Sequence, residues 1–182
     1  MNWFGLAGGI AVLVLIVVSF FVPWWQLLAG DNLVTANVSP IYTYFDFAGS
    51  SFTIPLLLAV NISCILLLAM GGTTIFLYSA RPAASYSRTL LKFSFWLPLV
   101  GVILFVLGLV LITLVAKSLW GVDIPLLGSA KVTLPSSVTR GTTVSVLLTA
   151  GFQWPFVLAL VAAVLCFWAK FYDKNVIPSQ TV

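Results

Sequence analysis

The sequence contains neither histidine nor glutamate among its 182 residues. Histidine is the commonest metal ligand and the usual proton shuttle near neutral pH. Its absence excludes bis-histidine haem, histidine-rich zinc and copper sites, and Ser-His or Cys-His nucleophiles. The two cysteines, Cys64 and Cys166, lie in different apolar segments and cannot assemble four soft ligands. We therefore expect no metal site, no bound cofactor and no catalytic residues, and favour a protein that is not an enzyme.

Charge is also scarce, since charged residues make up 7% of the chain and hydrophobic residues 62%. Soluble domains have about 25% charged and about 45–50% apolar residues. A water-soluble chain of this size could not bury so much apolar surface, so we expect the lipid bilayer to be its solvent. The net charge of +4 is spread singly along the flanks of apolar segments, with no basic stripe among exposed aromatic residues. We therefore expect no nucleic-acid partner.

Four apolar runs organise the chain, and about 20 apolar helical residues span the roughly 30 Å hydrocarbon core. We predict one membrane domain, residues 1–182, with an all-α integral membrane fold built as a four-transmembrane-helix bundle. The expected helices cover residues of about 3–25, 52–80, 93–116 and 144–169. The expected connections are an outer loop at 26–51, a cytoplasmic loop at 81–92, an outer loop at 117–143 and a cytoplasmic tail at 170–182.

The two long outer loops carry strand-like patterns, which predict small β-like extracytoplasmic loops. Alternating polar and β-branched or aromatic residues within 26–51 predict one or two short strands, and residues 122–135 suggest a hairpin with a turn at Gly128. Asn37 begins a triplet typical of an N-glycosylation acceptor, but the Pro40 that follows leaves its use open. Trp24 and Trp25 end the first helix, where we expect both indoles in the headgroup layer.

The basic residues predict the orientation, because cytoplasmic loops are enriched in lysine and arginine. With the loop at 81–92 inside, five basic residues lie on the cytoplasmic side and three on the outer side. We therefore expect a protein integral to the cell membrane with both termini cytoplasmic. The inner set is Arg81, Arg88, Lys92, Lys170 and Lys174, and the outer set is Lys117, Lys131 and Arg140.

Two groups of residues are candidate interaction sites. Gly5 and Gly9 form a Gly-x-x-x-Gly pair, which allows close helix approach, either inside the bundle or against another subunit. The two outer loops carry opposite charges: Asp31 and Asp46 lie in the first loop, and Lys131 and Arg140 lie in the second. We therefore expect the loops to pack together as an extracytoplasmic cap.

Asn61 and Ser63 are the inner polar groups of the second helix. They are weak candidates for binding a quinone or a lipid headgroup, and hydrogen bonds between helices are the favoured alternative. Cys64 and Cys166 lie at different expected depths, so we predict no disulfide between them.

In topology the chain is similar to claudin-type tetraspan proteins: four helices, cytoplasmic ends, and a strand-like first outer loop that opens at a tryptophan-rich helix end. It departs from their signature, because the first outer loop has no cysteine pair and no Gly-Leu-Trp motif follows Trp24 and Trp25. The resemblance implies adhesion or organisation of neighbouring molecules through the outer loops.

Three functions remain open. The leading hypothesis is a non-catalytic membrane protein acting through protein contacts, as an accessory subunit of a larger membrane complex. The first alternative is a claudin-like tetraspan adhesion or organising protein, and the second is a quinone- or lipid-handling membrane protein. The expected partners are the bilayer and other membrane subunits or further copies of this chain.

Overall fold

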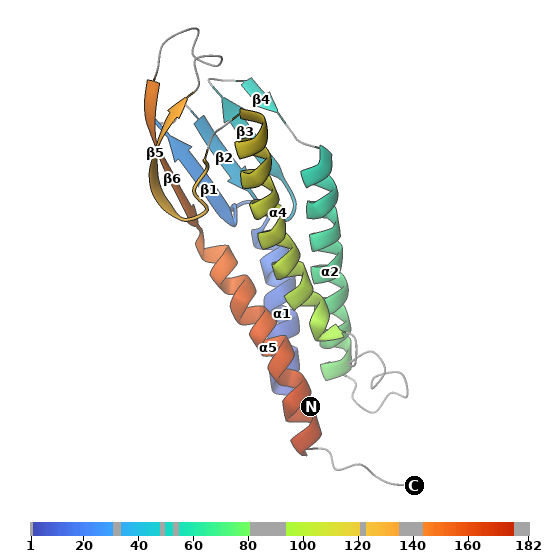
Figure 1. Cartoon of the computed structure of the whole chain (residues 1–182). Coiled ribbons are helices and arrows are strands. Elements are labelled where there is room, and N and C mark those ends of the chain that lie inside the picture. The colour runs from blue at the N-terminus through green and yellow to red at the C-terminus, as the bar shows by residue number, and fades with distance from the viewer. Residues whose placement is uncertain are drawn as a thin grey trace.

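The structure, a computed structural model, describes residues 2–30, 34–47, 50–52, 55–80, 94–120, 123–134 and 144–176. Within these ranges the chain forms four helices and one six-stranded sheet. Figure 1 shows the helices as an elongated bundle, with the sheet at one end and the start of α1 and the end of α5 at the other. The elements are α1 (Trp3–Val18), β1 (Trp25–Ala29), β2 (Val34–Val38), β3 (Thr43–Phe47), β4 (Ser50–Phe52), α2 (Pro55–Ala80), α4 (Trp96–Trp120), β5 (Gly128–Leu134), β6 (Val144–Phe152) and α5 (Trp154–Val176).

Three of the helices are long and apolar enough to cross a membrane. Their apolar spans are Leu57–Ala80 in α2, Trp96–Ser118 in α4 and Trp154–Phe171 in α5. Helices of this length and composition match the hydrocarbon thickness of a bilayer. The four expected helices are therefore present, and their composition indicates association with a membrane.

Helix α1 is shorter than expected, with 16 residues, and ends at Val18 instead of near Trp25. The Ser19 hydroxyl bonds the carbonyl of Leu15 at 2.6 Å, and backbone turns then continue as far as Val22. Pro23 has no N–H group to continue a helix. The next residue, Trp24, donates its backbone N–H to the carbonyl of Val38 in β2, so the chain leaves the helix to join the sheet.

The sheet runs in the order β4-β3-β2-β1-β6-β5, and every neighbouring pair is antiparallel. Strands β1 to β4 come from the first long loop, whereas β5 and β6 precede the last helix. The pairing of β1 with β6, in which Leu27 lies opposite Ala150, joins these two regions into one sheet. Two segments far apart in the sequence therefore form one continuous sheet.

Two predictions about the sheet were too modest or wrong. The fold is not all-α with small β-like loops, because the six-stranded sheet is a full layer at the end of the bundle. Residues 144–152 form strand β6 and not the start of the last helix, which begins at Trp154 with Pro155 in its first turn. The β-branched residues of this segment pair with β5, so the hairpin joins β5 to β6 and does not lie within residues 122–135.

Trp24 and Trp25 lie at the junction between bundle and sheet, and both are buried in the protein core, whereas their expected depth in a headgroup layer stays a prediction. The Trp24 ring packs at 4.9 Å from that of Phe105 in α4, and its Nε1 donates to the Ser19 hydroxyl at 2.8 Å. The Trp25 Nε1 donates to the Leu126 carbonyl at 2.8 Å. Each indole N–H has a partner, so burial leaves no unpaired donor.

Candidate functional site

The two faces of the sheet have different surroundings. The antiparallel register shows which residues belong to each face, because residues paired across neighbouring strands point to the same side. The inner face is apolar and packs into the protein core, with Trp25, Leu27, Ala29, Ala36, Val38, Leu148 and Ala150 buried. We call the opposite side the outer face. Its residues are Gln26, Leu28, Thr35, Asn37, Tyr44, Asp46, Ser129, Lys131, Leu147 and Thr149.

The outer face mixes exposed polar and apolar side chains. Tyr44 on β3 is 42% exposed and Leu147 on β6 is 53% exposed. An exposed aromatic and an exposed aliphatic side chain on a rigid sheet offer contact area to a partner at little cost in conformational entropy. Ser129, Lys131 and Thr149 on the same face are also exposed. This face is therefore a surface outside the helices that is available for contact.

Charges on the outer face lie at opposite sides of the sheet. Asp46 is on β3 and Lys131 is on β5, with β2, β1 and β6 between them. Four strand spacings of about 4.8 Å place the two backbones roughly 19 Å apart. The expected attraction between these two residues therefore does not hold the loops together. Backbone pairing of β1 with β6 joins the loops instead.

The remaining charged candidates have different outcomes. Asp31 and Arg140 lie outside the described residues. The ion pair present in the described part of this region joins Lys117, at the end of α4, to Asp123, with 2.8 Å between Nζ and Oδ1. Both side chains are largely exposed, so the pair stabilises the fold by only about 0–1 kcal/mol.

The phenol of Tyr44 has the clearest electrostatic environment on the outer face. Its hydroxyl donates to the Asp46 carboxylate at 3.0 Å. This hydrogen bond, together with the negative charge of Asp46, raises the pKa of Tyr44 above its ordinary value of 10.0. The tyrosine therefore stays protonated and able to donate throughout the physiological range.

Asn37 occupies the middle of the outer face, opposite Gln26 on one side and Tyr44 on the other. Its Oδ1 is buried and has no hydrogen-bond partner. The Ser39 of the same triplet is fully buried, and its hydroxyl donates to the Ser19 carbonyl at 2.7 Å. In the folded chain this triplet is therefore built into the sheet and is not presented as an exposed loop.

Gly5 and Gly9 lie inside the bundle, where they allow α1 to approach its neighbours. A Cβ atom at Gly9 would lie 2.9–3.0 Å from backbone and Cβ atoms of Phe76 in α2. A Cβ atom at Gly5 would collide with the Ser79 hydroxyl and lie 3.5 Å from Ala169 Cβ. Both positions are buried against helices of the same chain. The glycine pair could serve packing inside the bundle or contact with another subunit, and the described contacts are those of internal packing.

Asn61 and Ser63 do not converge on a common site. Asn61 is buried, and its Nδ2 donates to the Thr43 hydroxyl on β3 at 2.5 Å, which ties α2 to the sheet. Ser63 is exposed and donates to the Ala59 carbonyl of its own helix at 2.9 Å. The Asn61 amide bonds a strand and not another helix, so it acts as a brace between the two parts of the fold.

The cysteines are separated within the bundle. Cys64 Sγ lies 3.1 Å from the Gly101 carbonyl. Cys166 instead packs against Gly8 of α1, where an added Cβ atom would lie 2.9 Å from the Cys166 Sγ. Both thiols are free and buried. Within the described ranges no group of three or more potential metal-ligating side chains is found.

The sequence reasoning missed the outer face, because it did not identify β6. The signal was present, since Val144 and Val146 alternate with Ser145 and Leu147, and the β-branched Thr149 follows before Pro155. β-Branched residues ahead of a proline are typical of a strand followed by a helix start. Comparison with known proteins adds no identity, because no model of a known protein family matches the chain and no curated protein matches it.

Proposed function

We propose that this chain is a non-catalytic membrane protein that acts through protein contacts, and that the outer face of its sheet is the contact surface. Of the contact roles open to it, we favour a tetraspan adhesion or organising protein over an accessory subunit. Both roles place the chain in a cell membrane, with the sheet outside and both termini cytoplasmic.

The observation that carries this proposal is the pairing of β1 with β6, which fuses both non-helical regions into one sheet. Separate loops would offer mobile surfaces, whereas a joined sheet holds its side chains in a fixed arrangement and lowers the entropy lost on binding. An accessory subunit needs only helix faces to pack against its complex. The exposed apolar helix faces of this chain can contact lipid as well as another subunit, so they do not favour the accessory-subunit role.

A single added charge on the outer face tests the proposal. We expect Leu147→Arg to abolish association of the protein with its partner, because a charge would be desolvated at the contact. Association within one membrane is measured by chemical crosslinking of intact cells, and association between membranes by clustering of two differently labelled cell populations. Thermal unfolding in detergent should be unchanged, because the side chain at this position is exposed.

Ser118→Arg is the matched control, because it adds the same charge at an exposed position in the last turn of α4 and not on the sheet. It should leave association intact. Retained association in Leu147→Arg would overturn the proposed surface. Equal loss in both variants would show a general effect of charge and would also contradict it. Loss of binding to a different membrane protein, without loss of self-association, would instead support the accessory-subunit role.

A further inference from the structure

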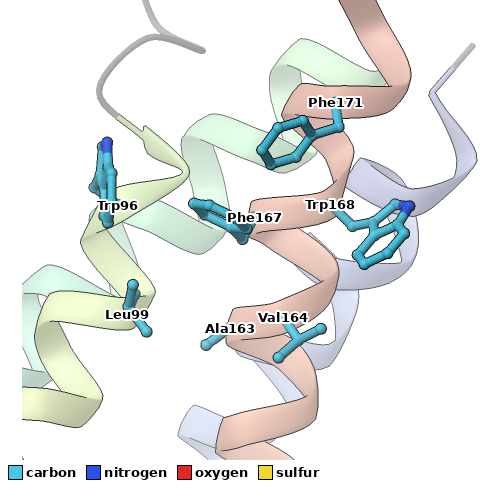
Figure 2. A pocket seen from close by; sticks show the side chains of 7 residues that line it. All are labelled: Trp96, Leu99, Ala163, Val164, Phe167, Trp168 and Phe171. Carbon is cyan, nitrogen blue, oxygen red and sulfur yellow. The ribbon is translucent and has the colours of Figure 1, made fainter. Parts of the chain in front are cut away.

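Helices α4 and α5 enclose an open groove toward the end of the bundle opposite the sheet. The groove has a volume of about 820 Å³. Figure 2 shows the side chains of both helices around it, with the tryptophan of α4 and that of α5 on opposite sides of the Phe167 ring. Its walls are entirely apolar or aromatic and include Trp96, Leu99, Val164, Phe167, Trp168 and Phe171.

The groove is shorter than the thickness of one lipid leaflet. From Val164 to Phe171 the helix rises by roughly 10 Å, which is less than half of a hydrocarbon core of about 30 Å. Trp96 and Trp168 are both exposed, and they lie at the start of the apolar span of α4 and near the end of that of α5, where the helices would leave the bilayer. Tryptophan is enriched at that depth because its ring is apolar and its N–H is polar.

A cation lies beside the groove at this same end. The Lys170 Nζ is 4.0 Å from the centroid of the Phe95 ring. Phe95 in turn contacts two walls of the groove, with ring centroids 5.2 Å from Trp96 and 6.0 Å from Phe167. The lysine ammonium thus lies against the Phe95 ring, which adjoins the aromatic wall of the groove.

The described carboxylates are remote from this lysine. Asp46 is in the sheet, and Asp123 follows α4 at the sheet end. Asp173, whose side chain lies outside the described set, comes three residues after Lys170 in the sequence. Within the described side chains the Lys170 ammonium has an aromatic ring as its neighbour and no ion-pair partner.

We propose that the groove binds an anionic phospholipid, with an acyl chain against the aromatic walls and the phosphate at Lys170. Charge complementarity selects this occupant. A quinone is neutral, and a zwitterionic lipid brings its own cation to the phosphate, so neither pairs with the ammonium as well. This site is independent of the sheet, and it lies at neither Asn61 nor Ser63.

The test uses the full-length protein in a mild detergent, with native mass spectrometry of bound lipid. The probes are phosphatidylglycerol and phosphatidylcholine with identical acyl chains. We expect the wild-type protein to retain phosphatidylglycerol about fivefold better than phosphatidylcholine, as one lysine near a membrane surface would provide. Lys170→Gln should remove this preference and leave phosphatidylcholine binding unchanged, and Lys170→Arg should restore the preference.

Two further variants separate the groove from general effects. Val164→Trp should reduce retention of both lipids, because the larger ring fills the groove at an exposed position. Lys117→Gln removes an exposed cation at the other end of α4 and should behave as wild type. A preference that survives in Lys170→Gln, or that Lys117→Gln also removes, would overturn the proposal. A crosslink from position 164 to a second copy of this chain in lipid vesicles would also overturn it.

Discussion

The bundle and the sheet bury their residues by different rules. Along α2 the exposed residues are as apolar as the buried ones, since Leu58 and Leu66 point outward while Leu57 and Leu68 point inward. Along the sheet, apolar buried residues alternate with more polar outer-face residues. In a bilayer the surroundings of a helix are as apolar as its core, so hydrophobicity does not tell the two sides apart. In water, hydrophobicity does distinguish the buried side from the exposed side, so the alternation along a strand identifies its buried face directly.

Close contact, and not hydrophobic patterning, therefore selects the inward faces of the helices. Gly9 fits against Phe76, and Gly72 fits where a Cβ atom would lie 2.7 Å from the Val12 side chain. Small residues let helix backbones approach, and the resulting van der Waals contact replaces the missing hydrophobic driving force. The predictions below test this contrast between a bundle that is stabilised by close packing of its helices and a sheet whose buried face follows the hydrophobic alternation of its strands.

The largest effect is expected at the junction of the two regions. Trp24 is 0% exposed and packs against Phe105 and Phe156 at ring-centroid distances of 4.9 Å and 6.2 Å. Trp24→Ala should lower the free energy of unfolding by about 3–5 kcal/mol, through lost burial and a remaining cavity. Denaturant unfolding in detergent measures this loss. Trp3→Ala is the control, because Trp3 is 63% exposed and should change stability by only about 0.5 kcal/mol.

The second effect tests fit within the bundle. Gly9→Ala places a Cβ atom 3.0 Å from the Phe76 Cα and backbone nitrogen, which cannot rotate away as a side-chain end would. Overpacking should destabilise the protein by about 1–3 kcal/mol, despite the better helix propensity of alanine. Gly151→Ala, on β6, meets nothing within 4 Å and should leave thermal stability unchanged or slightly raised. Equal stability of both variants would show that close approach does not hold α1 on α2.

A third, smaller effect tests the brace between the regions. Asn61→Ala removes the hydrogen bond to Thr43 and should lower stability by about 1 kcal/mol. Ser63→Ala should be neutral, because its hydroxyl only bonds its own helix. A double-mutant cycle of Asn61→Ala with Thr43→Val should show coupling. Additive losses would mean that the two side chains do not interact in solution.

The smallest effect concerns pH. Because Asp46 raises the Tyr44 pKa in the folded chain, the tyrosine contributes stability below the ordinary value of 10.0. This contribution is lost as the pH rises through the folded pKa. Ultraviolet titration, with Tyr44→Phe subtracted, should show the Tyr44 pKa falling toward its ordinary value in Asp46→Asn. An unchanged pKa in that variant would argue against the contact.

Much of the helical part could be predicted from the sequence. The ends expected for the second helix, near residues 52 and 80, differ little from those of α2 at Pro55 and Ala80. The same reasoning extended the first helix to Trp25 and began the last at Val144. At both places an apolar run crosses the boundary between a helix and a strand, so hydropathy alone gives no boundary there.

The candidate site was less accessible to sequence reasoning. The charges of Asp46 and Lys131 suggested a direct attraction between loops, but these residues lie on the same face with three strands between them. The Lys170 groove gave no signal, because its aromatic walls come from α4 and α5 and look in the sequence like any membrane-facing residues.

The sequence by itself determined the absence of histidine and glutamate side chains, the presence of four apolar helices, and the apolar surroundings that they require. Only the tertiary structure decided that Trp24 is core, that both loops form one sheet, and that a lysine stands beside an aromatic groove. The physical reason is that backbone pairing depends little on side-chain identity. Strands β1 and β6 meet although they lie far apart in the sequence, as the pairing of Gln26 with Gly151 shows, and no local pattern encodes that meeting.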